Sequence, residues 1–435
     1  MKKVILSFLA LVSLTASAQF GGFGGFGGGG GNPWVDSEAA TAEDFKPAKS
    51  NQDNKQYPMV NSARQVRAQI MAPDAKKVGL DIAGKIYTMT KDENGLWTGT
   101  SAPQDPGFHY YQLNVDGASV PDPGSTYYYG ASRWGSGIEV PSDDEDFWQV
   151  KNVPQGSMGE VYYYSSVTEQ MRRCFVYLPN EYFTNPTKKF PVLYLQHGMG
   201  ENEYSWPYQG RVAAIMDNLI AAKKAVPFIV VMDNGLNARR PQAQGAAQGQ
   251  GGQRPQGAPQ GQGGQRPQGG QRPQGGQGGF GGFGGGFGGF GGFGGGGGIA
   301  GAFKDVLFDD IMTMVEKNYR VIADPDHRAY AGLSMGGMQA REVTLANPGK
   351  FSYVGSFSSG AWSVDQVKNS EGFAKKTKLL FMSGGGKENM GCVEAAKNIR
   401  EQCGMNAVGY ESPGTAHEFH TWRRSLYQFA QLLFK

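Results

Sequence analysis

Between residues 61 and 150 the hydrophobic positions follow the alternation that is typical of β-strands. Val66, Ala68 and Ile70 alternate with polar residues, and Asp92–Gly95 is a turn sequence that separates two further strand-like runs. Short strands joined by such turns are typical of a small all-β sandwich. We therefore expect one β-sandwich domain over 61–150.

After residue 155 the pattern changes to apolar runs separated by amphipathic stretches. Residues 191–195 and 228–232 are continuous apolar runs, and between them apolar residues recur at helical spacing from Val212 to Ile220. Continuous apolar runs are typical of parallel strands that are buried on both faces. Strands and helices in alternation predict an α/β domain with a mostly parallel sheet over 155–435.

Glycine-rich segments interrupt these patterns at two places. Of the 435 residues 68 are glycine, and 26 of these fall in 251–300 and 9 in 21–31. Residues 241–300 repeat Gln-Arg-Pro-Gln-Gly and then Gly-Gly-Phe units, which bury too little apolar surface to fold alone, so we predict a disordered insert there. Residues 19–60 lack periodicity, and we expect a flexible lead-in.

The first 18 residues have the features of a secretory signal peptide. Lys2 and Lys3 precede an apolar run over 4–14, and Ala16-Ser17-Ala18 is a small-residue cleavage site. The run is too short to span a bilayer, and no other stretch is long enough. We expect cleavage after Ala18 and a secreted or periplasmic protein.

The net charge and the cysteine positions bear on the kind of partner and on disulfide bonds. The formal net charge is +3 without a basic cluster, so the sequence does not predict a nucleic acid partner. Cys392 and Cys403 share one face of a predicted helix about 16 Å apart at 1.5 Å per residue, and a disulfide needs Cα atoms within about 7 Å. We expect these two and Cys174 to be buried free thiols. Nothing in the sequence indicates an oligomeric state.

The motif Gly332-Leu333-Ser334-Met335-Gly336 is the candidate for catalysis. This G-x-S-x-G sequence lies between a strand-like run and a stretch compatible with a helix that ends at Pro348. A strand, a sharp turn and a helix form a nucleophile elbow, which exposes the serine oxygen at the start of the helix. We predict that Ser334 is a nucleophile; the alternative is a glycine-rich turn with an incidental serine.

A serine nucleophile needs a base, and the chain has five histidines. His109 lies in the β-rich region, His197 ends a predicted strand and His327 precedes the elbow strand. His417 and His420 follow the last predicted strand, where the α/β-hydrolase order places the base. We predict His417 as the base, because a loop of small residues precedes it, and His420 as a pocket or surface residue.

A carboxylate after the strand 379–383 would hold the histidine in the productive tautomer. Glu388 is the first acid there, so we predict it as the third member; Asp365 lies one strand earlier and Glu394 on a helix. A solvated loop charge is the alternative for Glu388.

Backbone N–H groups are expected to stabilise the oxyanion. The run His197-Gly198-Met199-Gly200 follows a predicted strand, and we predict the N–H groups of Met199 and Met335 as the donors. A mere turn is the alternative for this run. The chain has no H-E-x-x-H, no C-x-x-C and no dinucleotide-binding glycine motif, and we predict neither a metal nor a cofactor.

With these residues in view, the chain from about 157 to 435 resembles the first family of carbohydrate esterases, the feruloyl and acetyl-xylan esterases. The resemblance lies in Gly159-Glu160-Val161, Tyr164-Ser165-Ser166, 173–179, 191–200 with Trp206, 328–337 and 414–423. It implies an α/β-hydrolase fold with Ser334, His417 and Glu388 as the triad, although many relatives have Asp at the acid position. The insert departs from the family pattern. Trp206 and His420 are taken as candidate substrate contacts.

Residues 61–150, including Ala72–Val78, are similar to the glycogen-binding-type β-sandwich that often precedes such esterases. Trp97 and Trp134 are candidates for stacking on sugars, with burial in the core as the alternative.

These observations favour a secreted serine esterase that removes feruloyl or acetyl groups from a plant cell-wall polysaccharide such as xylan. Two other enzyme functions stay open. One is a siderophore esterase of the enterochelin type, which is usually cytoplasmic, so the predicted leader argues against it. The other is acyl transfer to a sugar. A non-catalytic glycan-binding protein on a hydrolase scaffold is the alternative from another class. Labelling by a fluorophosphonate separates it from the enzymes.

Overall fold

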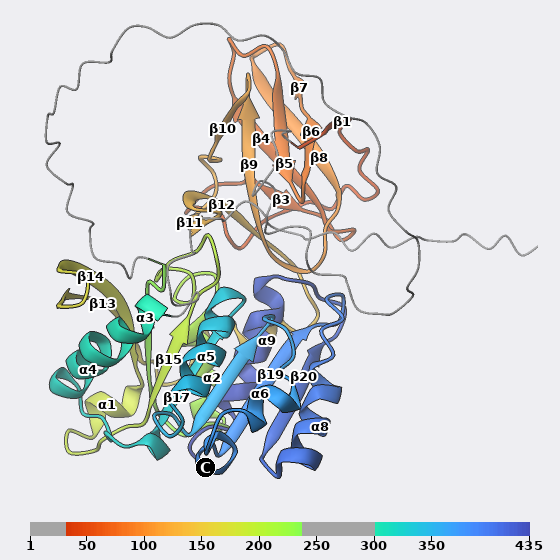
Figure 1. Cartoon of the computed structure of the whole chain (residues 1–435). Helices are drawn as coiled ribbons and strands as arrows, with labels where there is room; N and C mark the ends of the chain where they lie inside the picture. Colours follow the sequence, from red (N-terminus) through yellow and green to blue (C-terminus); the bar gives the residue numbers. More distant parts are fainter. Residues whose placement is uncertain (1–31, 237–300) are drawn as a thin grey trace, which may run out of the picture.

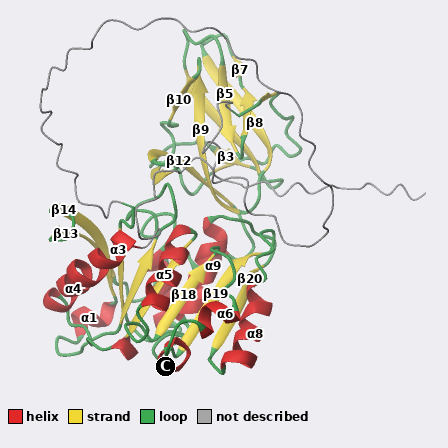
Figure 2. Ribbon diagram, in the orientation of Figure 1, coloured by secondary structure: helices red, strands yellow, loops and turns green. Residues whose placement is uncertain are grey.

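The computed structural model describes residues 32–236 and 301–435, which form a β-rich N-terminal domain and an α/β C-terminal domain (Figure 1). Figure 2 shows that strands dominate the N-terminal domain, whereas the C-terminal domain alternates strands with helices. The predicted leader (1–18) and insert (241–300) lie outside the described residues. Within the described ranges, no helix combines the length and the apolar character needed to cross a bilayer.

The N-terminal domain consists of two sheets. The first sheet has the order β1–β6–β5–β9–β12–β11, with β10 paired to β9, and the second has the order β2–β3–β4–β8–β7. The strands of the first sheet are β1 (Trp34–Val35), β5 (Val78–Ile82), β6 (Lys85–Thr88), β9 (Gly107–Val115), β10 (Ala118–Val120), β11 (Tyr127–Gly130) and β12 (Arg133–Val140). Those of the second are β2 (Lys46–Pro47), β3 (Met59–Val60), β4 (Gln65–Met71), β7 (Thr90–Lys91) and β8 (Leu96–Pro103).

One buried cluster is shared by both sheets of this domain. Val66 and Ala68 from β4 pack with Val78 and Leu80 from β5, as their alternation with polar residues predicts. Trp97 is buried here, and its Nε1–H donates to Ala72 O. Trp97 is therefore a core residue and is not free to stack on a sugar.

The segment 32–60 differs from the expected flexible lead-in. It supplies β1, which pairs in parallel with β6, and the strands β2 and β3 of the other sheet. The Lys77 Nζ lies 3.6 Å from the centroid of the Trp34 ring, and the buried side chain of Gln65 accepts the backbone N–H of Thr41. Two-residue strands carry no periodicity along the sequence, so the order of this segment comes from its tertiary partners.

The C-terminal domain is built on an eight-stranded sheet of order β13–β14–β16–β15–β17–β18–β19–β20. β13 and β14 are antiparallel, β14 pairs antiparallel with β16, and the strands from β16 onward in this order are parallel. This confirms the predicted α/β class. The strands are β13 (Ser157–Ser165), β14 (Gln170–Leu178), β15 (Val192–Gln196), β16 (Ile229–Asp233), β17 (Arg328–Leu333), β18 (Tyr353–Phe357), β19 (Leu379–Gly385) and β20 (Ala407–Ser412).

Helices cover both faces of this sheet (Figure 2). Leu193 and Leu195 of β15 pack in the cluster that contains α2 and α9, whereas Val192 and Tyr194 pack in the cluster that contains η2 and α5. The sheet is thus buried on both sides, which explains its continuous apolar strands. The helices are α1 (Asn180–Thr184), α2 (Val212–Ala221), α3 (Gly301–Asp305), α4 (Thr313–Asn318), α5 (Met335–Ala346), α6 (Val364–Lys368), α7 (Phe373–Lys376), α8 (Cys392–Cys403) and α9 (Phe419–Ala430), with short turns η1 (Glu145–Phe147), η2 (Val306–Met312, a π-helical turn) and η3 (Pro325–His327).

The three cysteines are free thiols, as predicted. Cys392 and Cys403 are the first and last residues of α8. Cys174 and Cys392 are buried, whereas Cys403 is only half-buried.

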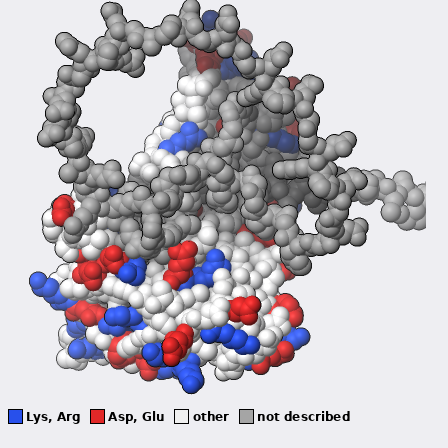
Figure 3. Space-filling model, in the orientation of Figure 1, with Lys and Arg blue, Asp and Glu red and all other residues white. Residues whose placement is uncertain are grey.

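The two domains meet above the carboxyl ends of the parallel strands. The turn between β11 and β12 reaches the loop after β15, where the N–H of Ser132 donates to the carbonyl of Gly200 at 2.7 Å (Figure 1). Nearby, Gln209 Nε2 donates to the Tyr110 hydroxyl at 2.6 Å. On the face shown in Figure 3, basic and acidic side chains are interspersed over the C-terminal domain. The N-terminal domain is therefore placed at the edge of the sheet where the candidate site lies.

Candidate active site

Ser334 lies in a sharp turn between β17 and α5. Its φ of 50° and ψ of −116° are unusual for a residue with a side chain. The turn is anchored by the Ser334 N–H, which donates to Phe357 O at 2.7 Å. A Cβ on Gly332 would lie 2.4 Å from the backbone of Gly336, and a Cβ on Gly336 would lie 2.6 Å from His197 O. Both glycines are therefore needed for this close packing, and the predicted strand–turn–helix context is present.

The structure brings Ser334, His417 and Glu388 into one line of hydrogen bonds. His417 Nε2 lies 3.0 Å from Ser334 Oγ, and His417 Nδ1 lies 2.7 Å from Glu388 Oε1. A carboxylate at Nδ1 favours the tautomer that carries its proton there, so that Nε2 is the nitrogen that can accept the serine proton. The side chains come from three separate loops, after β17, β19 and β20.

Two further hydrogen bonds hold the second oxygen of Glu388. Its Oε2 accepts from Ser358 Oγ at 2.7 Å and from the Gly385 N–H at 2.6 Å. Burial opposes the charge on Glu388, but the hydrogen bond and the charge of His417, together with these two donors, lower the pKa of Glu388 below its ordinary value. The carboxyl group is thereby kept ionised beside the imidazole.

The glycines at 384–386 let the acid loop pack against the histidine loop. A Cβ on Gly385 would lie 2.4 Å from the carbonyl oxygen of Thr415. The other acids considered from the sequence lie elsewhere: Asp365 is in the first turn of α6 and Glu394 in the first turn of α8. Glu388 is the acid whose carboxylate oxygen lies 2.7 Å from the imidazole.

The predicted oxyanion donors lie on both sides of Ser334. Met335 is the first residue of α5, whose first N–H groups have no acceptor within the helix. Met199 lies in the loop after β15, between Gly198 and Gly200. A Cβ on Gly198 would be 3.3 Å from Ser334 Cβ, so this loop packs directly against the nucleophile. The arrangement is compatible with the predicted role of the two N–H groups.

His197 supports this loop as a neutral imidazole. Its Nδ1 lies 2.7 Å from Gly198 O, and its Nε2 accepts the Gly235 N–H at 3.0 Å. Burial lowers the pKa of His197 to about 4. The ring therefore donates through Nδ1 and links the loop after β15 to the loop after β16.

Trp206 and His420, which the sequence suggested as substrate contacts, are buried elsewhere, and this expectation is corrected. Trp206 is 1% exposed, and its Nε1–H donates to Gln196 O at 2.8 Å. His420 is also 1% exposed and lies beneath Gly107 of the N-terminal domain, where a Cβ would be 2.7 Å from the His420 Cβ. Both side chains are structural because the sheet core and the domain contact cover them.

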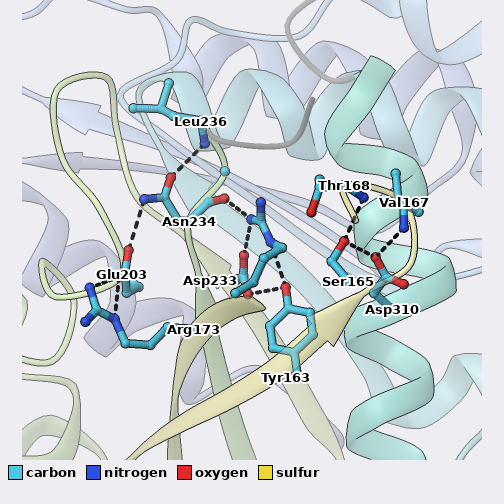
Figure 4. Close-up of polar contacts among 12 residues, drawn as sticks. Tyr163, Ser165, Val167, Thr168, Arg173, Glu203, Asp233, Asn234, Leu236 and Asp310 are labelled. Carbon is cyan, nitrogen blue, oxygen red and sulfur yellow. Dashed lines mark hydrogen bonds and ion pairs between the residues drawn. The ribbon is translucent and has the colours of Figure 1, made fainter. Parts of the chain in front are cut away.

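A polar network beside the site was not found from the sequence (Figure 4). Glu203 Oε1 accepts from the Arg173 guanidinium, and Glu203 Oε2 accepts from Asn234 Nδ2 at 3.0 Å. The Asn234 Oδ1 in turn accepts the Leu236 N–H at 3.0 Å. The network joins the loop after β15 to the loop after β16. Asn234-Gly235 follows a predicted strand, which is a usual position for functional residues in α/β sheets. This position is the sequence signal that could have indicated the network.

Beside it lies a buried ion pair. Arg172 donates to Asp233 Oδ1 at 2.6 Å, and the Tyr163 hydroxyl donates to Asp233 Oδ2 at 2.7 Å (Figure 4). Burial raises the pKa of Asp233, although Arg172 and Tyr163 oppose this effect. The pair fixes the antiparallel contact of β14 with β16.

Comparison with known proteins places these features in a family. The model of a family described as "Putative esterase" matches residues 165–265 and 267–432. An endo-1,4-beta-xylanase/feruloyl esterase from Xylanibacter ruminicola is 40% identical over 401 residues, which are 90% of this chain and 48% of the relative. The chain thus spans about half the length of that relative.

Solved structures match across both domains. The enterochelin esterase from Shigella flexneri has a TM-score of 0.53 at 13% identity and covers 90% of this chain and 95% of its own. The enterobactin esterase from Shigella flexneri in the presence of enterobactin has a TM-score of 0.54 at 14% identity, covering 85% of this chain and 92% of its own. At these identities the likeness is one of fold.

Proposed function

The chain belongs to the esterase family whose model it matches, and from this membership we propose that it is a secreted serine esterase that acts on feruloyl or acetyl esters of plant cell-wall xylan. The observation that carries the proposal is the line of hydrogen bonds from Ser334 through His417 to Glu388. The substrate class is supported by the 40% identical relative, which is an endo-1,4-beta-xylanase/feruloyl esterase.

In the first half of the proposed reaction, Ser334 is acylated. His417 Nε2 takes the proton of Ser334 Oγ as the oxygen attacks the ester carbonyl carbon, and the carbonyl π electrons move onto oxygen. The oxyanion is stabilised by the N–H groups of Met335 and Met199. When the C–O bond to the sugar breaks, the leaving oxygen takes the proton from His417, and the acyl group stays on Ser334.

In the second half, water releases the acid. His417 takes a proton from water while the water oxygen attacks the acyl carbon, and Ser334 regains its proton as it leaves. Glu388 stays ionised throughout and stabilises the imidazolium that forms twice in each cycle. The products are a free carboxylic acid and the de-esterified sugar hydroxyl.

A substrate screen with one variant tests the proposal. The purified protein is assayed with methyl ferulate, an aryl acetate, acetylated xylan and feruloylated arabinoxylan, beside Ser334→Ala. We expect hydrolysis of at least one ester class and a kcat that is lower by at least about 10³-fold in the variant. A fluorophosphonate should label the wild type and not Ser334→Ala. An unlabelled wild type with no turnover would instead support the non-catalytic alternative.

A siderophore triester is the second candidate substrate, because the structures that match both domains in fold are an enterochelin esterase and an enterobactin esterase. It is included in the same screen. Turnover of enterobactin that exceeds turnover of every wall-derived ester would replace our substrate class.

Two further parts of the proposal have their own tests. N-terminal sequencing of protein exported from a bacterial host tests the proposed cleavage after Ala18. Addition of a soluble xylo-oligosaccharide as acceptor tests for acyl transfer.

The N-terminal domain is the proposed glycan-binding part. Trp134 on β12 is 46% exposed, and its ring meets the ring of Tyr204 of the C-terminal domain at 4.9 Å between centroids. Affinity electrophoresis in gels containing arabinoxylan should show retardation of Ser334→Ala, and the added substitution Trp134→Ala should reduce it. Equal mobility with and without the polysaccharide would contradict binding.

A further inference from the structure

Glu201 is a buried acid that the proposed reaction does not use. It directly follows the predicted oxyanion segment Gly198–Gly200, and the residue is 1% exposed. Its Oε2 accepts the Gly198 N–H at 3.0 Å, while Oε1 has no hydrogen-bond partner among the described residues. In the part of the chain that the structure describes, no lysine, arginine or histidine forms an ion pair with this carboxyl group.

The carboxyl group lies close to the nucleophile. The position that a Cβ would take on Gly198 is 3.3 Å from Ser334 Cβ and 3.5 Å from Glu201 Oε2. Both groups therefore border the same small space next to Met199, one residue further along. A negative charge there would repel the oxyanion that forms on the substrate, since Coulomb energies are large where water is excluded.

Four hydrogen bonds hold the backbone of this loop. Besides the Glu201 carboxyl on the Gly198 N–H, the Glu201 N–H donates to Gly198 O at 3.3 Å, and Gly200 O accepts from Ser132 at 2.7 Å. The fourth is donated by His197 Nδ1 to Gly198 O at 2.7 Å. Of the four, only the first is accepted by a side chain of the loop. Removal of that acceptor leaves a buried N–H unpaired and frees the segment that carries Met199.

We propose that Glu201 is a positioning residue for the oxyanion loop: as a neutral acid, it holds the Gly198 N–H and places no charge beside the reacting carbonyl. The proposal rests on the proposed esterase function. Its consequence is that catalysis requires Glu201 to be protonated, whereas Glu388 must be ionised. The same site then uses two glutamates in opposite charge states, because their surroundings differ.

The electrostatic surroundings support the neutral form. Burial raises the pKa of Glu201 to about 8, and the hydrogen bond from Gly198 opposes this only in part. By contrast, Glu388 receives a hydrogen bond and positive charge from His417, which lower its pKa. We therefore expect Glu201 to be a neutral acid at pH 7 and to ionise as the pH rises through about 8.

Two other titratable groups near Glu201, Tyr110 and His197, have pKa values far from 8. From β9, Tyr110 faces the carboxyl group, and burial followed by the charge of Glu201 raises the pKa of Tyr110 well above its ordinary value. From the end of β15, burial lowers the pKa of His197 to about 4. Glu203 of the same loop forms an ion pair with Arg173. The positive charge of Arg423 on α9 opposes part of the rise in the pKa of Tyr110. Glu418, which follows His417 in the sequence, is the other acid that could cause a loss of activity at alkaline pH. Burial also raises the pKa of Glu418.

The experiment compares pH profiles of kcat/KM for methyl ferulate, or for the best ester of the screen. The wild type should lose activity as the pH rises through about 8. Glu201→Gln should keep activity at pH 7 within about threefold, because the amide oxygen accepts the Gly198 N–H, and should retain this activity up to pH 9. Glu201→Ala should lower kcat about 10- to 100-fold at pH 7 with KM little changed, as expected for a misplaced oxyanion donor.

Two variants serve as controls. Asp217→Asn removes another buried acid that accepts a backbone N–H, from Gly156 at 2.9 Å, and it should leave the alkaline decline in place. Glu418→Gln should also leave it in place. The proposal is overturned by a wild-type profile that stays flat to pH 9, a measurement that needs no variant. It is equally overturned if Glu201→Gln retains the decline or if Glu418→Gln removes it. Absence of any turnover or labelling in the wild type would instead reject the proposed function.

Discussion

Glu139 and Arg423 form a bidentate ion pair that joins the two domains. Glu139 on β12 accepts from Arg423 on α9 at 2.6 and 3.1 Å, and both side chains are at most 2% exposed. The Arg423 Nε–H also donates to Gln209 O at 2.6 Å in the loop between β15 and α2. The pair therefore ties the N-terminal domain to the segment that continues from the oxyanion loop.

Removal of one partner of this pair should destabilise the protein strongly. Glu139→Ala leaves a buried guanidinium without its partner, which typically costs about 3–5 kcal/mol of the free energy of unfolding. Urea unfolding followed by tryptophan fluorescence measures the change. The matched control is Lys387→Ala, which breaks the exposed interdomain pair with Asp105 at 2.7 Å and should cost at most about 1 kcal/mol. Similar losses in both variants would contradict the importance of the buried pair.

Glu388→Gln should reduce kcat by about 10²- to 10⁴-fold with KM little changed. The amide can present N–H instead of a carboxylate to His417 Nδ1, which favours the wrong tautomer and fails to stabilise the imidazolium. Steady-state kinetics on the best ester of the screen measures this effect. Asp365→Asn is the control and should be nearly silent, because Asp365 lies on α6. A crippled Asp365→Asn with an active Glu388→Gln would place the acid one strand earlier.

Gly385→Ala should lower kcat without global unfolding. The added Cβ would meet the Thr415 carbonyl oxygen at 2.4 Å, so the acid loop and the histidine loop must separate. We expect at least about a tenfold loss, since small displacements of catalytic groups are costly. Gly159→Ala is the matched control, because a Cβ on Gly159 would meet no atom within 4 Å. Equal activity of the two variants would show that the loops tolerate the separation.

His420 should make the folded protein sensitive to acid. Burial lowers the pKa of His420 to about 4, whereas in the unfolded chain it returns to its ordinary value near 6.5. Between these values the unfolded state binds more protons, so the free energy of unfolding rises with pH by up to about 1.4 kcal/mol per pH unit and per histidine. The contribution is complete above the ordinary value and is lost as the pH falls toward 4.

His420→Gln should therefore flatten the dependence of stability on pH between about 4.5 and 6 by close to one proton. Unfolding at a series of pH values measures the slope. An equal slope in the wild type and in His420→Gln would contradict this role of His420. Activity measurements distinguish His420 from His417. His417→Ala should lose at least about 10³-fold in kcat. His420→Gln should retain KM, because His420 is covered by Gly107 of the N-terminal domain.

Features that depend on residues close together along the chain could be predicted from the sequence. The G-x-S-x-G elbow is local, since Gly332 and Gly336 enclose Ser334 within one turn of chain. The alternation in β4 and the apolar runs of β15 and β16 follow from which faces are buried. The order of strands and helices then left His417 and Glu388 as candidates at the correct edge of the sheet.

Which side chains face each other, and which are covered, depends on the folded chain. The tertiary structure ordered residues 32–60 through strand partners far along the chain, and it buried Trp206 and His420, which looked from the sequence like substrate contacts. It also gave Glu201 and Glu388 different surroundings, a desolvated N–H in one case and an imidazole in the other. Burial and charge are set by atoms brought together from distant segments, and a pattern along the chain contains no distances between such segments.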